Sequence, residues 1–516
     1  MSDPTLLHHY LIESARRLPD KIALVEKKRR LTYREIDERS SALGHALIQR
    51  GVARGDRVVV FADNTVEAVV SFWGVLKANA VVSMVSPQTK ADKLGYLLND
   101  CRASALITDA RLAPVFGPAA ASSPHLRAII ASGDLSALGP LGAELSSWDE
   151  ALAGEGASTP PRSFAIDVDL ASIIYTSGST GEPKGVMLTH RNMLAAATSI
   201  TTYLENVEDD VILCALPLSF DYGLYQMIMA FRMGARLVLE RSFAYPAEAL
   251  AVVVREGVTG FPGVPTMFAL LAEMKGLADH DLRRVRYVTN TAAALPVKHI
   301  TTLQRLFPGA RVYSMYGLTE CKRCTYLPPA DLDRKPTSVG VAIPNTELWL
   351  VDEDDRRLGP NQVGQLVIRG ATVMRGYWEK PGATAEKLRP GPLPGEMVLY
   401  TGDYCRLDEE GYLYFVGRMD SIIKSRGEKV APKEIEMVLT NLAGVKEAAV
   451  IGVPDEILGE APKAFVVLER GARLGERELR AACQAALEPF MVPKYFELID
   501  ELPRTTTGKI TKRGLQ

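Results

Sequence analysis

A stretch rich in glycine, hydroxyl and lysine side chains follows an apolar run in the first half of the chain. Residues 175–185 read Tyr-Thr-Ser-Gly-Ser-Thr-Gly-Glu-Pro-Lys-Gly, and the run 170–174 before them is a predicted buried strand. A strand that ends in such a loop leaves backbone N–H groups and hydroxyls available to hold phosphate oxygens. A flexible surface turn is the plain alternative, because the same residue types form turns everywhere.

The spacing within this loop excludes the common nucleotide-binding loop. That pattern requires Gly-Lys-Ser/Thr directly before a helix, whereas Lys184 is followed by Gly185 and then by apolar residues. We therefore expect neither a kinase-like nor a GTPase-like site.

The elements that must position this loop alternate between strand and helix. Within residues 31–100, the run 57–61 predicts a buried strand and the run 67–77 predicts an amphipathic helix, which together indicate a mostly parallel sheet covered on both faces. Residues 118–163 are rich in Ala, Ser, Gly and Pro, and we interpret them as surface excursions. After the loop, Thr189 is expected to cap a helix, and His190 is either a phosphate contact or a structural residue.

The composition limits the classes of partner. The 516 residues are enough for two or more domains, and 60 Lys+Arg against 62 Asp+Glu give a net charge of −2. A net charge this small produces no electrostatic field that would attract nucleic acid or an anionic membrane. The amino terminus lacks the pattern of a signal peptide and charges interrupt the apolar runs, so we expect a soluble, cytoplasmic protein.

The cysteines do not indicate a disulfide framework or a metal centre. Six cysteines are few for a chain of this length, and Cys321 and Cys324 form a lone Cys-x-x-Cys pattern. No second pair accompanies it, so zinc or redox chemistry is not expected there.

The loop at 175–185 resembles the signature of the AMP-forming adenylating superfamily, which includes acyl-CoA synthetases, adenylation domains of peptide synthetases and luciferases. Further motifs follow in the expected order over nearly the whole chain. The resemblance implies an α/β fold with a large N-terminal domain of βα-layered sheets, residues 1–419, and a small α+β lid, residues 420–516, joined by a hinge at Asp420. The residues that it implies for ATP phosphates are Thr176, Ser177, Gly178, Ser179, Thr180, Gly181 and Lys184.

A second motif, at 315–320, reads Met-Tyr-Gly-Leu-Thr-Glu. An aromatic ring can stack on a purine, a hydroxyl can donate to a phosphate oxygen, and a carboxylate can hold Mg²⁺. By resemblance these roles belong to Tyr316, Thr319 and Glu320, with Gly317 between them.

The remaining nucleoside contacts are also implied by resemblance. Ala292, Ala293 and Ala294 stand where relatives usually have glycines whose backbone lies against the adenine. Asp403, in the third motif at 400–403, is expected to accept hydrogen bonds from the ribose hydroxyls, and Arg418 is expected to be a second ribose and phosphate contact.

The resemblance also implies an acyl pocket. Its expected residues are Phe220, Asp221, Tyr222, Gly263, Met315, Lys322 and Cys324. Many acyl-CoA synthetases have a histidine where this chain has Phe220. Asp221 is either a ligand for a substrate ammonium group, as in amino-acid adenylation domains, or the N-cap of the next helix. Lys322 and Arg323 either enter the pocket, which argues against a long alkyl tail, or turn outward.

The implied reaction has two steps. The carboxylate of a small acid attacks ATP to give an acyl adenylate, with Mg²⁺ and Lys509 offsetting the negative charge, and a thiol then releases AMP. Rotation about Asp420 exchanges Lys509 for Gly427, which lines the thiol tunnel. Coenzyme A is the expected thiol, and the phosphopantetheine of a separate carrier protein is the alternative. A protein that only senses a nucleotide, without catalysis, is expected to lack one of the charged side chains of the site. This chain has all of them: Lys184, Glu320, Asp403, Arg418 and Lys509.

Overall fold

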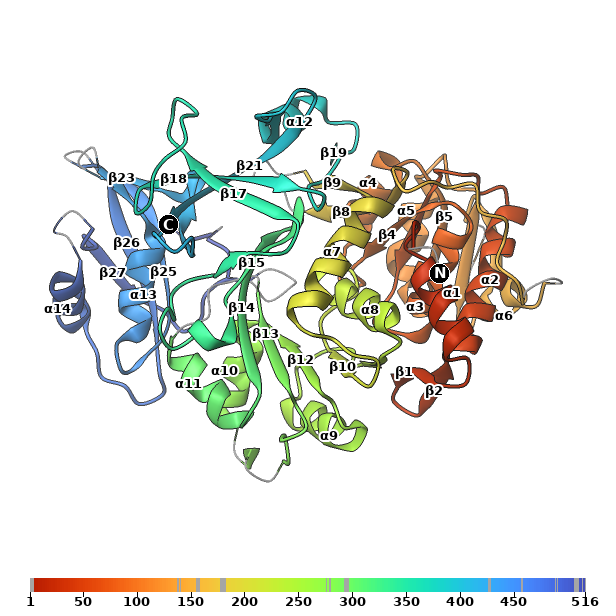
Figure 1. The fold of residues 1–516 in the computed structure, drawn as a ribbon, viewed down its shortest axis with the longest axis horizontal. Helices are drawn as coiled ribbons and strands as arrows, with labels where there is room; N and C mark the ends of the chain where they lie inside the picture. Colours follow the sequence, from red (N-terminus) through yellow and green to blue (C-terminus); the bar gives the residue numbers. More distant parts are fainter. Residues whose placement is uncertain are drawn as a thin grey trace.

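The computed structural model describes residues 4–136, 139, 141–154, 158–176, 182–274, 276–277, 280–291, 297–425, 428–455, 458–487, 489, 491–504, 510–512 and 514–515. The chain has a mixed α/β fold, and its N-terminal and C-terminal elements lie at opposite ends of the molecule (Figure 1). This architecture confirms the expected α/β class.

The first large sheet has eight strands and is parallel through its centre. In spatial order they are β19 (Gly376–Tyr377), β9 (Lys184–Thr189), β8 (Leu170–Thr176), β4 (Val81–Val85), β3 (Arg57–Phe61), β5 (Ala103–Asp109), β6 (Ala128–Ser132) and β7 (Glu144–Ser147). The helices that go with it are α2 (Tyr33–Gln49), α3 (Val66–Lys77), α4 (Ala91–Asp100), α5 (Ala113–Ala121) and α6 (Trp148–Leu152). The predicted strand over 57–61 is β3, and the parallel pairing of β3 with β4 and β5 confirms the expected sheet.

The interpretation of residues 118–163 as surface excursions is wrong in part. The segment contains β6, β7 and α6, and β6 pairs in parallel with β5. The run 128–131 is short, apolar and buried, so neighbouring strands rather than sequence periodicity identify it.

The second large sheet has nine strands. In spatial order they are β16 (Val341–Ala342), β15 (Cys321–Tyr326), β14 (Arg311–Leu318), β13 (Tyr287–Asn290), β12 (Gly260–Gly263), β10 (Val211–Cys214), β11 (Arg236–Leu239), β1 (Ile22–Glu26) and β2 (Arg29–Thr32). The helices that go with it are α1 (His9–Arg17), α7 (His190–Tyr203), α8 (Asp221–Met233), α9 (Pro246–Glu256), α10 (Pro265–Glu273) and α11 (Val297–Leu306). Strands β14 and β15 form an antiparallel hairpin at one end of this sheet.

Two smaller sheets complete the chain. One contains β17 (Thr346–Val351), β18 (Val363–Gly370), β21 (Met397–Leu407), β20 (Leu388–Pro390) and β22 (Leu413–Arg418), with α12 (Pro381–Lys387) beside it. The other contains β24 (Glu428–Val430), β23 (Ile423–Ser425), β26 (Gly459–Leu468), β25 (Val445–Asp455) and β27 (Tyr495–Leu498), with α13 (Pro432–Asn441) and α14 (Glu476–Ala486). The described residues also include the short 3₁₀ segments η1 (Ala110–Leu112), η3 (Pro329–Asp331) and η4 (Met419–Ser421), the last of which connects the two small sheets.

Helix α3 belongs to the core that joins the two large sheets. It begins one residue before the predicted start, and the Thr65 side chain accepts a hydrogen bond from the Ala68 N–H at its N-terminus. The expected amphipathic character is wrong, because every residue of α3 except Glu67 is buried. A Cβ added at Gly74 would lie 2.8 Å from Leu43 Cδ2, so α2 packs closely over the side that the sheet leaves uncovered.

A buried ion pair fixes the end of α3 against α2. Lys77 Nζ lies 2.6 Å from Asp37 Oδ1 and donates to the hydroxyls of Ser40 and Ser41. Burial lowers the pKa of Lys77 to about 8, and Asp37 opposes this shift. The ammonium group therefore depends on the Asp37 carboxylate to stay charged.

We expect Asp37→Ala to lower the free energy of unfolding by about 3 kcal/mol at pH 7, because it leaves a buried charge without its counter-ion. The deficit should shrink above pH 8, where native Lys77 is neutral in both proteins while the unfolded lysine keeps its proton up to about 10.5. Urea unfolding at pH 7 and pH 10 measures both effects. Asp20→Ala removes an exposed partner of Arg34 and serves as the control, and an equal loss in the two variants would contradict the prediction.

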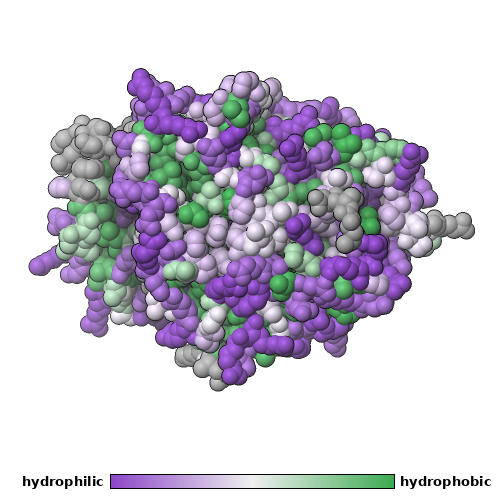
Figure 2. All heavy atoms as spheres, viewed as in Figure 1, coloured by the Kyte–Doolittle hydropathy of each residue, from purple (hydrophilic) through white to green (hydrophobic). Residues whose placement is uncertain are grey.

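The surface is polar, as the balanced composition implies. Hydrophilic side chains cover most of the face shown in Figure 2, with apolar side chains scattered between them. Among the described helices, none combines the length and apolar character needed to cross a membrane.

Candidate active site

The predicted phosphate loop lies at the turn of the hairpin formed by β8 and β9. Thr176 and Lys184 are paired in register at its open end, and the Thr176 hydroxyl donates to the Lys184 carbonyl oxygen at 3.4 Å. Ser177, Gly178, Ser179, Thr180 and Gly181 lie outside the described residues. The hairpin therefore places the two ends of the loop side by side.

The end of β9 leads directly into α7 through a strong helix cap. The Thr189 side chain accepts from the Asn192 N–H, and the Asn192 side chain accepts from the Thr189 N–H, so the predicted cap is confirmed. His190 is buried, and its Nδ1 accepts a hydrogen bond from the Leu7 N–H at 3.1 Å. Burial lowers the pKa of His190 to about 4, so it is a neutral structural residue rather than a phosphate contact.

Lys184 and Glu320 come together through a third residue, Tyr377. The Tyr377 hydroxyl donates to Glu320 Oε1 at 2.7 Å, and Lys184 Nζ lies 5.5 Å from the centre of the Tyr377 ring. Burial and the Glu320 carboxylate raise the pKa of Tyr377, so its hydroxyl keeps its proton and remains a donor. Tyr377 is not among the residues predicted from the sequence. It stands on β19, which pairs with β9 of the loop hairpin, and this position is visible only in the folded chain.

The residues predicted for the nucleoside form a second cluster. The Tyr316 hydroxyl donates to Asp403 Oδ2 at 2.5 Å, and Arg418 Nε lies 3.8 Å from Asp403 Oδ1. Asp403 and Arg418 are paired in register on β21 and β22, and the Phe415 ring lies 5.9 Å from the Tyr316 ring. Two segments far apart in the sequence, the 315–320 motif and the β21–β22 hairpin, therefore converge at one place.

Two further predicted contacts lie around this cluster. Thr319 and Glu320 form the turn between β14 and β15. A Cβ added at Gly317 would lie 3.0 Å from the Cα of Arg323, so glycine lets the two strands approach closely. Ala292, Ala293 and Ala294 lie outside the described residues.

The predicted roles of Asp221 need correction. Phe220 is the N-cap of α8, without a side-chain cap, and Asp221 is the first helical residue. The Asp221 carboxylate instead pairs with Lys322 Nζ at 3.0 Å, and both side chains are buried. Asp221 is therefore neither a cap nor available to a substrate ammonium group while this pair is formed.

Lys322 and Arg323 do not turn outward. Their side chains are buried beside the aromatic rings of Tyr222 and Tyr225. Burial, opposed by the Asp221 carboxylate and aided by the nearby charge of Arg323, lowers the pKa of Lys322 to about 8. The structure thus brings two cations and one carboxylate into the region predicted as the acyl pocket.

The other predicted pocket residues pack closely. Tyr222 donates its hydroxyl hydrogen bond to the Thr289 carbonyl oxygen at 2.9 Å, and a Cβ added at Gly263 would lie 2.5 Å from the Phe268 ring. The Met315 thioether accepts from the hydroxyl of Tyr203 at 3.1 Å. The residues predicted for the acyl pocket therefore lie together in one compact region that is rich in aromatic rings.

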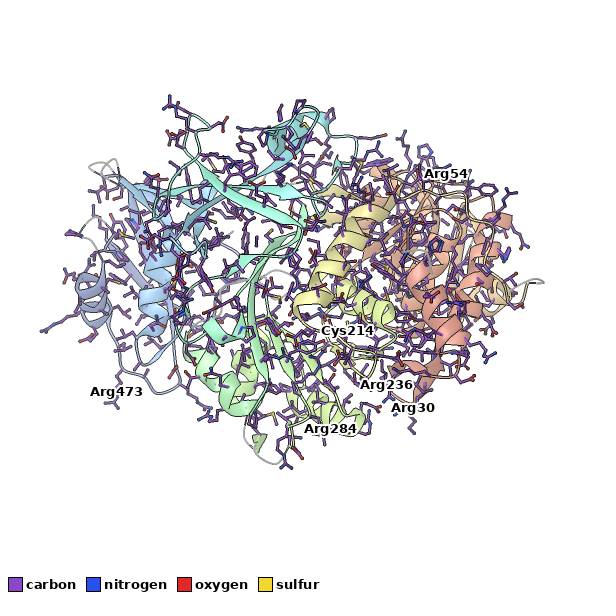
Figure 3. The ribbon with its side chains drawn as sticks, in the orientation of Figure 1. Arg30, Arg54, Cys214, Arg236, Arg284 and Arg473 are labelled. Atoms are coloured by element: carbon purple, nitrogen blue, oxygen red, sulfur yellow. The ribbon has the colours of Figure 1, made fainter. Side chains whose placement is uncertain are left out.

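The cysteines are free thiols in the core. All six are buried, and the Cys324 S–H donates to the Cys321 carbonyl oxygen at 3.4 Å. Cys214, for example, lies near the centre of the molecule (Figure 3). Among the described residues, no group of three or more His, Cys, Asp or Glu side chains could hold a metal ion.

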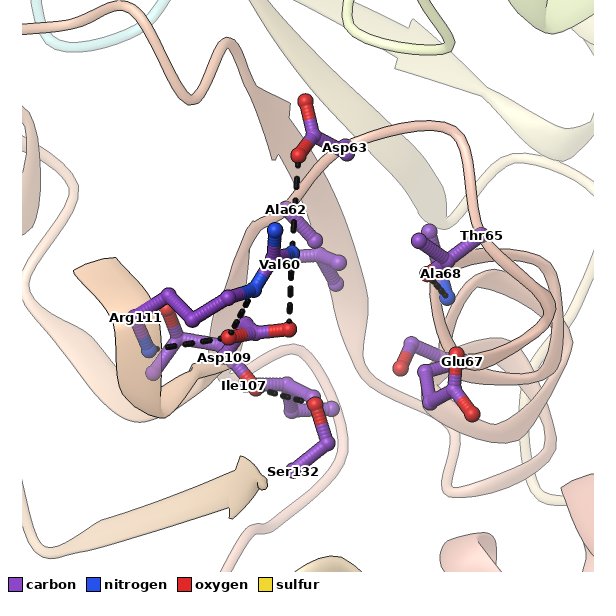
Figure 4. Close-up of a pocket in the computed structure, with 12 residues that line it drawn as sticks. Val60, Ala62, Asp63, Thr65, Glu67, Ala68, Ile107, Asp109, Arg111 and Ser132 are labelled. Atoms are coloured by element: carbon purple, nitrogen blue, oxygen red, sulfur yellow. Dashed lines mark hydrogen bonds and ion pairs between the residues drawn. The ribbon is translucent and has the colours of Figure 1, made fainter. Parts of the chain in front are cut away.

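A hollow between β3, β5 and α3 is separate from these clusters (Figure 4). Arg111 Nε donates to Asp109 at 2.9 Å, and its guanidinium lies 3.6 Å from Asp63. The cavity volume is about 10 Å³, which is barely the space of one water molecule. This hollow is not the site.

Of the predicted lid residues, Asp420 lies in η4, and Gly427 and Lys509 lie outside the described residues. Arg504 and Ile510, on either side of the segment that carries Lys509, are paired as an isolated antiparallel bridge. The roles of all three remain predictions.

A large α/β part followed by a small C-terminal part is the architecture of adenylate-forming enzymes. The chain belongs to the AMP-binding enzyme family: the family model matches residues 11–378, and the model of the AMP-binding enzyme C-terminal domain matches residues 434–509. The long-chain-fatty-acid–CoA ligase of Bacillus subtilis (strain 168) is 32% identical over 99% of this chain and 94% of the relative.

Two solved structures have the same fold. ATP-bound MatB from Rhodopseudomonas palustris has a TM-score of 0.86 and 27% identity, covering 98% of this chain and 97% of that one. The anthranilate CoA ligase AuaEII, solved with anthranoyl-AMP, has a TM-score of 0.88 and 27% identity, covering 99% and 96%. The similarity to both extends over nearly the whole chain.

Proposed function

We propose that this chain is an AMP-forming acid:CoA ligase, which activates a carboxylic acid with ATP and then transfers the acyl group to coenzyme A. The observation that supports it best is the convergence of Tyr316 with Asp403 and Arg418, which lie together on the remote β21–β22 hairpin. Such a cluster offers an aromatic ring and a carboxylate to one nucleoside. The family membership and the CoA-ligase names of the relatives agree with this activity.

In the first step, the substrate carboxylate attacks the α-phosphorus of ATP, a new P–O bond forms, and pyrophosphate leaves. The chain binds the phosphates with the 176–184 loop, and Lys184 and Lys509 offset the charge between the two anions. No covalent enzyme intermediate is needed.

The Glu320 carboxylate fits a magnesium ion. Mg²⁺ in nucleotide sites is held by one or two carboxylates together with phosphate oxygens, and Glu320 is held beside Lys184 by Tyr377. When bound, the ion would neutralise charge on the phosphates. The chain's part is to hold the carboxylate in place through the Tyr377 hydroxyl.

In the second step, the thiol attacks the adenylate carbonyl, a C–S bond forms, and AMP leaves. We assign residues 1–419 to the nucleotide-binding domain and 420–516 to a lid that turns at Asp420, which exchanges Lys509 for Gly427. Loading of a carrier-protein phosphopantetheine is not favoured, because the long-chain-fatty-acid–CoA ligase and the anthranilate CoA ligase resemble this chain over nearly their whole length.

A two-part assay tests the proposal. Labelled pyrophosphate should be incorporated into ATP only with Mg²⁺ and a suitable acid, which reports the adenylate. Addition of coenzyme A should then give a thioester and AMP, whereas phosphopantetheinylated carrier proteins should not. Absence of exchange across short aliphatic, aromatic, long-chain and dicarboxylic acids would overturn the function, and a preference for carrier proteins would overturn the choice of thiol.

A further inference from the structure

Arg323 is a buried cation with few partners. It is 2% exposed, and its backbone φ of 56° lies in the left-handed region, which is uncommon for a residue other than glycine. Nη1 donates to the Met315 thioether at 2.7 Å and to the Tyr203 hydroxyl oxygen at 3.4 Å. Nε and Nη2 are buried, and neither has a hydrogen-bond partner among the residues that the structure describes.

The charge around Arg323 is not balanced within the described chain. The buried carboxylates described near this strand already have partners: Asp221 is paired with Lys322, and Asp403 accepts from Tyr316 and lies 3.8 Å from Arg418. The Tyr222 ring lies 4.6 Å from the Arg323 guanidinium carbon and offsets part of the cost of burial. A thioether and a phenol oxygen are weak acceptors for a guanidinium, so one positive charge lacks an anion.

The two nitrogens without partners have a defined geometry. Nε and Nη2 lie on the same edge of the guanidinium plane, and their N–H groups point in parallel. This edge is the fork that binds both oxygens of a carboxylate. The neighbouring acceptor, Met315, has a flexible side chain that can move aside for such a ligand.

The backbone of Arg323 lies beside the motif proposed to hold the nucleotide, since its Cα lies 3.0 Å from where a Cβ on Gly317 would stand. The long Arg323 side chain leads away from this backbone contact into the region predicted as the acyl pocket, beside the Tyr222 ring. On the proposed function, a group bound there corresponds to the far end of an acid whose reacting carboxylate lies near Thr319 and Glu320.

We propose, on the basis of the function proposed above, that Arg323 binds a second carboxylate of the substrate and that the preferred acid is a short dicarboxylic acid. A long alkyl chain would bury methylenes against the uncompensated guanidinium, which is unfavourable. An amino-acid substrate is also disfavoured, because the Asp221 carboxylate, the candidate ligand for its ammonium group, is already paired with Lys322.

The test compares acids of matched length on the unmodified chain. Thioester formation with coenzyme A is measured for malonate, succinate, glutarate and adipate and for propionate, butyrate, pentanoate and hexanoate. The best dicarboxylic acid should exceed its matched monocarboxylic acid by about 50-fold in kcat/KM, which is typical of a buried charge pair. Higher activity with monocarboxylic acids, or activity only with aromatic or long-chain acids, would overturn this inference and leave the ligase function standing. Inactivity with all of these classes of acid would count against the ligase function itself.

Variants then assign the effect to Arg323. Arg323→Met should lower kcat/KM for the dicarboxylic acid by about 50-fold and leave or raise that for the monocarboxylic acid, while Arg323→Lys should restore part of the preference. Arg232→Met is the matched control, because Arg232 also lies over a tyrosine ring and donates to a tyrosine hydroxyl. An equal loss for both classes of acid in a variant with unchanged melting temperature would show a structural role and overturn the inference.

Discussion

Replacement of Lys509 by alanine is expected to lower the rate of adenylate formation by about 100- to 1,000-fold and to leave thioester formation from a preformed adenylate unchanged. An ammonium group offsets the repulsion between the substrate carboxylate and the phosphates only while the first bond forms. In the proposed second step the lid has turned and Lys509 has left the cleft. Pyrophosphate exchange measures the first step, and release of AMP from synthetic acyl adenylate and coenzyme A measures the second.

A matched control is available on the same part of the chain. Arg473 is an exposed cation at the far end of the molecule (Figure 3), so Arg473→Ala should leave both half-reactions unchanged. If Lys509→Ala impaired the two half-reactions equally, this result would contradict the proposal that lid rotation exchanges Lys509 for Gly427 between the two steps.

Glu320→Gln is expected to lower adenylate formation by about 100-fold or more and to raise the Mg²⁺ concentration needed for half-maximal activity. The amide has nearly the same shape and still accepts the hydrogen bond of Tyr377, so the change isolates the negative charge. A titration with Mg²⁺ at saturating ATP and acid measures both quantities.

The Tyr377→Phe variant separates the effect of the position of the Glu320 carboxylate from the effect of its charge. It removes only the hydroxyl that holds Glu320 at 2.7 Å, so the loss should be nearer 10-fold. An unchanged Mg²⁺ requirement in Glu320→Gln would show that another group holds the metal.

Local features of the fold were predictable because their causes are local. Thr189 caps α7 through contacts with a residue three positions away, and the run at 57–61 forms β3 because each of its Val and Phe side chains is apolar. The predicted amphipathic pattern of α3 failed, because α2 covers the side that would otherwise face water. The sequence of a helix does not show which element packs on the face that points away from the sheet.

The Asp221 prediction failed for a related reason. An aspartate before a helix is a common cap, and the sequence shows no competitor for its carboxylate. Lys322 stands a hundred positions further along, and the hairpin of β14 and β15 brings it within 3.0 Å of Asp221. A buried ammonium is a stronger partner for a carboxylate than a backbone N–H is.

The sequence by itself determined the family, the α/β class and the order of the motifs, since these depend on residue types and spacing along the chain. Only the tertiary structure decided that Tyr316 lies against Asp403, that Tyr377 joins Lys184 to Glu320, and that Arg323 is buried. The contacts of Tyr316 with Asp403 and of Tyr377 with Glu320 join segments of different sheets, and the order of the strands and the packing of the sheets are decided together only in the folded chain. Hydrogen-bond satisfaction can be judged only after that order is known.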